Sequence, residues 1–338
     1  MKHVTNTKTR IGYIDALRGF TMILVVCHHI ITSCHEITDF SFAGFFMLFR
    51  MPLFFFISGF VLYKASRKWD YTSLSKFLKA KFLIQVIPTL IFLFLFNLIF
   101  NLSSINLKIN GYWFTIALFE FFVIYGLLSS HVRCIKNMKL GGGIILILTG
   151  LILYIFGNKS FPFYIMAFFS LPLHYFIFFA MGIICKKYFN LFQSKILDNN
   201  ISISFIIATF FILSIVYLKF SIDIFIIHII IELILGCLGI ITIFALFRKN
   251  KVFFEQSNYL SNGLKFIGRR TLDIYLLHFF FIQNILTWIL PYLQINPSPT
   301  LELIIALILS FLVIGLCLFL SSILRVSPFL AKYLFGSK

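Results

Sequence analysis

The stretch IDALRGFTMILVVCHHIIT, residues 14–32, decides the fold class. It is long and apolar enough to cross a bilayer, since a hydrocarbon core about 30 Å thick needs roughly 20 apolar residues in a helix. It nevertheless carries Arg18 and His29. A charged side chain at the middle of a membrane helix costs about 2.5–3.5 kcal/mol, so such residues mark candidate functional sites. We therefore expect a retained first membrane helix, because no small-residue cleavage site of a signal peptide follows the apolar run.

The rest of the chain repeats this pattern. Hydrophobic residues make up 60% of the 338 positions and charged residues 12%, which is too little polar surface for a water-soluble protein of this size. The apolar segments are continuous, as in helices, whereas strands of a membrane barrel alternate. We predict an all-α, polytopic membrane protein of about ten transmembrane helices, forming a single domain over residues 1–338 with no appended soluble domain. The expected spans are 13–33, 43–64, 82–101, 112–130, 141–157, 163–185, 201–218, 223–247, 271–290 and 301–324.

The positive charges predict how these spans are oriented. Of the 29 Lys and Arg residues, 24 lie at the two ends or in alternate loops, and two, Arg18 and Arg50, lie within spans. The intervening loops hold the remaining three, Lys108, Lys159 and Lys219. This asymmetry is the positive-inside pattern, and it places both termini in the cytoplasm if the number of spans is even. The net charge of +18 thus indicates a basic cytoplasmic face at the cell's inner membrane rather than nucleic-acid binding. Its partners are membrane lipids or a phosphorylated cytosolic ligand.

The first helix aligns two of its polar residues. Arg18 and His29 are 11 residues apart, which is about three turns, about 16 Å along the axis and within roughly 20° of one face. One groove can therefore present both side chains, while His28 lies about 100° away. Snorkelling of Arg18 to the surface, with an ion pair to Asp15, explains Arg18 but leaves the alignment of His29 unexplained.

The second helix reads RMPLFFFISGF, residues 50–60. It runs from outside to inside, which predicts that Arg50 lies near the depth of His29 and that Ser58 lies nearer Arg18. Two alternatives stay open. Ser58 and Gly59 are also small residues of the kind that allow close helix packing, and Arg50 is also compatible with an interfacial anchor.

These residues carry a resemblance to a known family. The run from Ile14 to Gly19, the spacing of Arg18 and His29, and the run from Pro52 to Phe60 strongly resemble the acyltransferase 3 family of membrane O-acyltransferases. Two later stretches agree, namely GYWF at residues 111–114 and the segment from Gly268 to His278. The resemblance covers almost the whole chain.

The resemblance implies transfer of an acyl group, usually acetyl, from cytoplasmic acyl-CoA to a hydroxyl of an extracytoplasmic or lipid-linked glycan. Arg18 would bind the donor, and His29 would act on the acceptor hydroxyl as a general base or as a transient acyl carrier. Family members commonly have two arginines before the proline that opens the third helix. Here Lys81 keeps one charge and Gln85 has none, which puts donor binding by this element in doubt.

The remaining membrane-embedded candidates extend this site. We expect a substrate path formed by Arg50, Ser58, Trp113, Glu120 and His278. No metal site and no bound cofactor are expected, because acyl-CoA is a substrate and the six cysteines show no metal-binding spacing. A glycan exporter or flippase is the main rival function, because transporters also hold charges within the membrane. A structural subunit is a third possibility, and the oligomeric state is left open.

Overall fold

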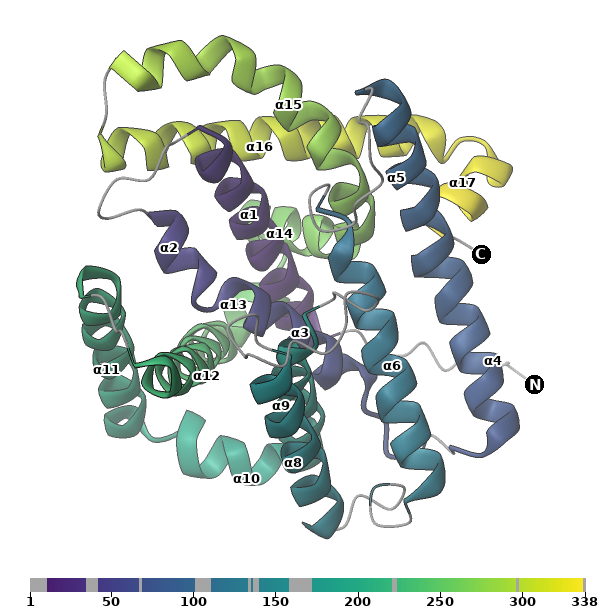
Figure 1. The fold of residues 1–338 in the computed structure, drawn as a ribbon, viewed down its shortest axis with the longest axis vertical. Helices are drawn as coiled ribbons and strands as arrows, with labels where there is room; N and C mark the ends of the chain where they lie inside the picture. The colour runs from purple at the N-terminus through teal and green to yellow at the C-terminus, as the bar shows by residue number, and fades with distance from the viewer. Residues whose placement is uncertain are drawn as a thin grey trace.

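The computed structural model describes residues 11–34, 42–66, 69–100, 111–132, 135, 140–157, 172–220, 224–295 and 298–336. These residues form helices and connecting turns, and no strand occurs among them. Figure 1 shows the arrangement. The helices are α1 (Gly12–Cys34), α2 (Phe42–Met47), α3 (Arg50–Leu62), α4 (Tyr71–Lys81), the π-helix η1 (Phe82–Val86), α5 (Ile87–Ile99), α6 (Trp113–His131), α8 (Leu140–Phe156), the 3-10 helix η2 (Leu173–Tyr175), α9 (Phe176–Lys187), α10 (Phe189–Phe192), the π-helix η3 (Gln193–Leu197), α11 (Asn200–Lys219), α12 (Phe225–Lys249), α13 (Lys251–Glu255), α14 (Tyr259–Arg269), α15 (Thr271–Ile295), α16 (Pro299–Leu324) and α17 (Pro328–Phe335).

The all-helical prediction is confirmed, whereas the predicted number of ten spans is not. Seven described helices are long and apolar enough to cross a membrane, or eight if the pair Leu173–Lys187 and Phe189–Leu197, bent by 93°, is one span. Two shorter apolar segments lie at two further positions where a span was predicted, namely Gly141–Phe156 of α8 and Thr271–Gln283 of α15. Residues 163–171 of the expected span 163–185 lie outside the described part of the chain. Ten spans, cytoplasmic termini and a single domain stay predictions.

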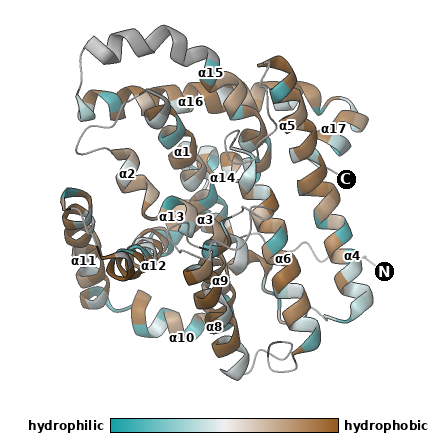
Figure 2. Cartoon of the chain, in the orientation of Figure 1, coloured by the Kyte–Doolittle hydropathy of each residue, from teal (hydrophilic) through white to brown (hydrophobic). Residues whose placement is uncertain are grey.

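The distribution of polar residues fits a multi-pass membrane protein. On α5, Leu90, Phe94 and Leu98 are exposed, whereas Thr89 and Asn97 are buried. The amide of Asn97 donates to the Leu93 carbonyl oxygen within the same helix. Figure 2 shows that α5, α8 and α11 consist largely of hydrophobic residues. Apolar side chains outside and polar ones inside are what a lipid environment requires.

Two pairs of helices pack backbone against backbone through glycine. A Cβ added at Gly59 of α3 would lie 2.0 Å from a backbone oxygen of α9, and one added at Gly182 of α9 would lie 2.0 Å from a backbone oxygen of α3. The second crossing joins α1 to α14, where a Cβ at Gly19 would lie 2.1 Å, and one at Gly268 1.8 Å, from a backbone oxygen of the other helix. Small residues permit this approach between membrane helices. Gly59 therefore has the packing role that the sequence left open.

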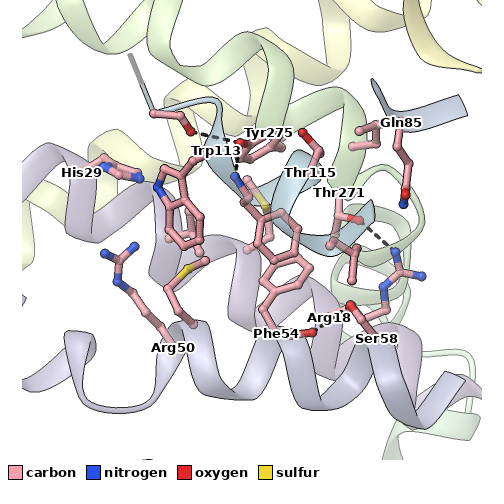
Figure 3. Close-up of a pocket in the computed structure, with 17 residues that line it drawn as sticks. Arg18, His29, Arg50, Phe54, Ser58, Gln85, Trp113, Thr115, Thr271 and Tyr275 are labelled. Atoms are coloured by element: carbon pink, nitrogen blue, oxygen red, sulfur yellow. Dashed lines mark hydrogen bonds between the residues drawn. The ribbon is translucent and has the colours of Figure 1, made fainter. Parts of the chain in front are cut away.

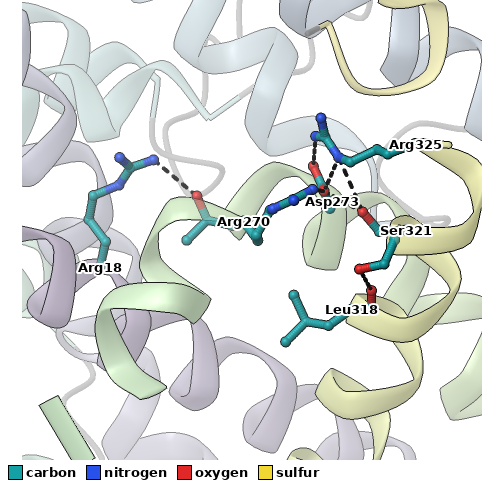
Figure 4. Close-up of polar contacts among 8 residues, drawn as sticks. Arg18, Arg270, Asp273, Leu318, Ser321 and Arg325 are labelled. Carbon is teal, nitrogen blue, oxygen red and sulfur yellow. Dashed lines mark hydrogen bonds and ion pairs between the residues drawn. The ribbon is translucent and has the colours of Figure 1, made fainter. Parts of the chain in front are cut away.

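A buried carboxylate joins the start of α15 to the end of α16. Asp273 is 2% exposed, and its oxygens lie 3.1 Å from Nη1 of Arg270 and 2.7 Å from Nη2 of Arg325. The hydroxyl of Ser321 also donates to Asp273. Figure 4 shows Asp273 with Arg270, Ser321 and Arg325. Thr271, the first residue of α15, lies two positions before Asp273. The ion pairs thus hold the first turn of α15, which also carries Thr271.

Candidate active site

A cavity of about 750 Å³, measured with its open mouth, lies between α1, α3, α6, α15 and the π-helix η1. Figure 3 shows its polar residues in two groups, with His29 and Arg50 at one end and Arg18, Ser58, Gln85 and Thr271 at the other. Apolar and aromatic side chains, including Phe54 and Trp113, lie between the two groups. The lining residues are Arg18, Met22, Val25, His29, Arg50, Met51, Phe54, Ser58, Gln85, Gly111, Trp113, Phe114, Thr115, Leu118, Thr271, Leu272 and Tyr275.

Arg18 is held by the neighbouring helix end. Its Nη2 donates to Oγ1 of Thr271 at 3.0 Å. Asp15, the partner considered for Arg18, instead lies 3.2 Å from Nε of Arg269 on α14. The hydroxyl of Ser58 donates to the Phe54 carbonyl oxygen on its own helix at 2.9 Å. The guanidinium of Arg18 is therefore positioned by α15 at the edge of the cavity.

His29 lies at the opposite end of the cavity, beside a second histidine. The ring of His278 is 5.4 Å from that of His29, centroid to centroid, and the ring of Phe279 is 4.9 Å away. His278 is fully buried, and its Nδ1 lies 2.8 Å from the Tyr275 carbonyl oxygen, so Nδ1 carries the proton. Its Nε2, now an acceptor, has no hydrogen-bond partner among the described residues. By contrast, His28 points away and its Nδ1 bonds to the carbonyl oxygen of Ala43 at 3.2 Å.

Arg50 brings a buried positive charge to the His29 end. Its side chain faces the cavity and is 7% exposed, which argues against a surface anchor. Within the described part of the chain no carboxylate pairs with it, and its Nε lacks a hydrogen-bond partner. A buried guanidinium without a counterion is unfavourable by itself. The cavity therefore holds a cation available to a substrate that carries or develops negative charge.

Trp113 is placed by a fixed turn at the start of α6. Gly111 has φ +73°, a left-handed conformation that favours glycine, and an added Cβ would lie 2.0 Å from the ring of Phe279. The hydroxyl of Tyr275 donates to the Gly111 carbonyl oxygen and accepts from the Phe114 N–H, both at 3.0 Å. Tyr275 on α15 thus ties this turn to the cavity.

A second cavity of about 690 Å³ shares Arg18, Ser58 and Gln85 with the first and adds Lys64 and Lys81. The ammonium of Lys81 lies 4.9 Å from the ring centre of Phe122. The shared lining residues make the two cavities neighbours along α3. The basic residues lie beyond Arg18, on the side away from His29.

The predicted site residues are thus brought together in part. Arg18, His29, Arg50, Ser58 and Trp113 line the first cavity and Lys81 the second. His278 lies behind His29 rather than on the cavity wall, and Glu120 of α6 lines neither of these two cavities. Their chemical roles stay predictions.

Three lining residues were missed as site candidates by sequence reasoning. Thr271 and Tyr275 are four residues apart, a spacing that puts both on one helix face, so the pattern was available within the quoted segment. Gln85 was noted only for its missing charge. It lies in the π-helix η1, a local widening often found at functional sites, and its side-chain oxygen has no partner among the described residues.

Comparison with known proteins assigns the chain to a family. The acyltransferase 3 profile, described as an acyltransferase domain, matches residues 11–321. No curated protein and no solved structure shows a significant match. The matched region includes every residue that lines the two cavities. The chain belongs to the acyltransferase 3 family and is a membrane acyltransferase.

Proposed function

We propose that the protein is an O-acetyltransferase of the cell's inner membrane. It transfers the acetyl group of cytoplasmic acetyl-CoA to a hydroxyl of an extracytoplasmic or lipid-linked glycan, such as a capsule, exopolysaccharide or lipopolysaccharide. The observation that supports this most is one cavity with Arg18 and His29 at opposite ends, adjoining a second cavity with Lys64 and Lys81. Both termini are cytoplasmic in this proposal, so the basic cavity opens toward the donor.

The basic cavity is the donor site in this proposal. Coenzyme A carries phosphates at one end and the acyl thioester at the other, joined by a long pantetheine arm. Lys64 and Lys81 attract the phosphates, and Arg18 contributes a charged fork suited to phosphate oxygens. The arm then extends past Gln85, whose side-chain oxygen can accept from a pantetheine amide. The thioester arrives near His29, about 16 Å further along α1.

The His29 end is where the acyl group moves. His29 takes the proton of the acceptor hydroxyl as a general base, and the hydroxyl oxygen attacks the thioester carbonyl carbon. A tetrahedral intermediate forms with negative charge on the former carbonyl oxygen. Arg50 stabilises that charge, because a fixed cation in a cavity shielded from water acts strongly on a developing oxyanion. The carbon–sulfur bond then breaks, the CoA thiolate leaves and takes up the proton, and the ester remains on the glycan.

The test is a chemical comparison of surface glycan from cells with the gene, without it, and with the gene carrying His29→Gln. We expect an O-acetyl group that is present only with the unmodified gene, and its position identifies the acceptor. An unchanged O-acyl pattern in all three strains would overturn the proposal. A lower amount of glycan with unchanged O-acylation would instead support an exporter.

A further inference from the structure

A third cavity, of about 690 Å³ with its open mouth, lies next to the first. The three cavities follow one another along α3 and its flanking residues. Pro52, near the start of α3, lines the third cavity, the first extends from Arg50 to Ser58, and the second extends from Ile57 to Lys64. The third cavity therefore lies at the His29 end of the site, away from the lysines.

A polar cluster opens into this cavity from α11 and α12. The hydroxyl of Tyr217 donates to Oε1 of Glu232 at 3.1 Å and lies 2.9 Å from Nε2 of His228, which is then the donor to it. The other carboxylate oxygen of Glu232 is 3.7 Å from Nδ1 of His228. Glu232 is 38% exposed, so its carboxylate is within reach of a ligand. The cluster thus presents a fixed hydrogen-bond acceptor.

Aromatic rings also line the cavity. The ring of His174 lies 6.1 Å from that of Tyr154 and 4.1 Å from that of Tyr175. Tyr175 in turn stacks on Trp113, with ring centres 6.0 Å apart and planes 15° from parallel. Trp113 lines the first cavity, so this stack separates the third cavity from the one that holds His29 and Arg50.

These groups favour one class of ligand. The C–H faces of a sugar ring pack against aromatic rings while its hydroxyls donate to a carboxylate. A lipid chain would offer no donor to the acceptor positions that the Glu232 carboxylate keeps beside its bond from Tyr217. A phosphate or acidic sugar would meet the negative charge of Glu232, and none of the described lining residues is Lys or Arg. The chemistry therefore matches an uncharged sugar ring.

We propose that the third cavity binds a neutral sugar unit of the acceptor glycan, with Glu232 and Tyr217 as hydrogen-bonding residues. The Trp113–Tyr175 stack lies between this unit and the cavity that holds His29. The proposal rests on the proposed function for the identity of the ligand as an acceptor.

The experiment uses the full-length protein in lipid nanodiscs. The probes are short water-soluble fragments of de-O-acylated surface glycan, separated by ion exchange into neutral and acidic pools. Binding without donor is followed by tryptophan fluorescence, because Trp113 contacts Tyr175. Transfer is followed separately with radiolabelled acetyl-CoA. The variants are Glu232→Gln and Tyr217→Phe, and Glu255→Gln is the control because it makes the same change at an exposed residue outside the three cavities.

We expect the neutral pool to bind to the unmodified protein, and Glu232→Gln and Tyr217→Phe each to weaken that binding at least tenfold. In the transfer assay both variants should raise the acceptor KM with little change in kcat, while Glu255→Gln resembles the unmodified protein. Equal binding and equal KM in Glu232→Gln and the control would overturn the sugar site even if transfer occurs. Preference for the acidic pool would overturn it too. Glu232-dependent binding without any acetyl transfer would support the sugar site and contradict only the proposed function.

Discussion

Replacing Gly19 by alanine places a methyl group between α1 and α14, where the two backbones touch. The added Cβ would lie 2.1 Å from the Leu264 carbonyl oxygen and 3.1 Å from the Gly268 nitrogen. Ordinary contacts begin at 3.4 Å, so the helices must separate by about 1.3 Å, the difference between 3.4 and 2.1 Å. Because the opposing atoms are backbone, no side-chain rotation can relieve the clash.

The separation acts directly on the site. Arg18 precedes Gly19, and its partner Thr271 lies two residues beyond α14, so moving the helices apart stretches their 3.0 Å hydrogen bond. A misplacement of about 1 Å near reacting groups can reduce turnover roughly 100-fold. Overpacking a close contact costs about 1–3 kcal/mol of stability. We expect Gly19→Ala to show about 100-fold lower kcat/KM and a lower melting temperature.

The assay is acetyl transfer and thermal unfolding of the purified protein in the same detergent. Gly263→Ala is the matched control, because Gly263 lies on α14, the other helix of the crossing, and no neighbouring atom lies within 4 Å of its added Cβ. Alanine is favoured over glycine inside a helix by about 0.5–1 kcal/mol, so the control should melt at the same or a higher temperature with activity retained. If Gly19→Ala matches the control in both measurements, the close crossing does not position Arg18.

Three further predictions follow from single side chains. Arg50→Met removes a buried charge that no described carboxylate pairs, so we expect unchanged or higher thermal stability with kcat lowered about 100-fold or more in the transfer assay. Asp273→Asn leaves Arg270 and Arg325 without their carboxylate and should reduce the unfolding free energy by about 3–5 kcal/mol, seen as a lower melting temperature in detergent. Hydrogen bonds from Thr72 and Ser73 hold the pKa of Asp70, the N-cap of α4, well below its ordinary value of about 3.9. The Asp70 cap should therefore stabilise α4 fully above about pH 3.9, and this stabilisation should be lost as the pH falls through the lowered pKa. The measurement is amide exchange in the first turn of α4, which should become faster when the cap is lost. Asp70→Asn should remove this pH dependence.

Local patterns predicted the parts of this molecule that depend on one helix at a time. Continuous apolar runs predicted the helical fold, in which seven or eight of the described helices are long and apolar enough to cross a membrane. The 11-residue spacing of Arg18 and His29 indicated one shared groove, and both residues line one cavity. The antiparallel course of α3 followed from chain connectivity and placed Arg50 near His29 and Ser58 near Arg18 (Figure 3). These inferences need only the period of a helix and the alternation of direction across a bilayer.

The remaining parts depend on contacts between distant segments. Arg18 bonds to Thr271, 253 residues away, and no sequence pattern names that partner. The π-helix η1 that carries Gln85 has no local signature in its residues FLIQV. The third cavity is built from residues of α2, α3, η2, α9 and three more helices, and the bond from Tyr217 of α11 to Glu232 of α12 is not indicated by either helix alone.

The proposed function requires His29 to perform acyl transfer in the cavity that Arg18 and Arg50 share. The direct measurement is transfer of label from radiolabelled acetyl-CoA to de-O-acylated surface glycan by the protein purified into lipid vesicles. His28→Gln is the matched control, because His28 adjoins His29 but bonds to the Ala43 carbonyl oxygen instead of facing the cavity. We expect transfer by the unmodified protein and by His28→Gln, and none by His29→Gln at equal melting temperature. Undiminished transfer by His29→Gln would contradict this role of His29.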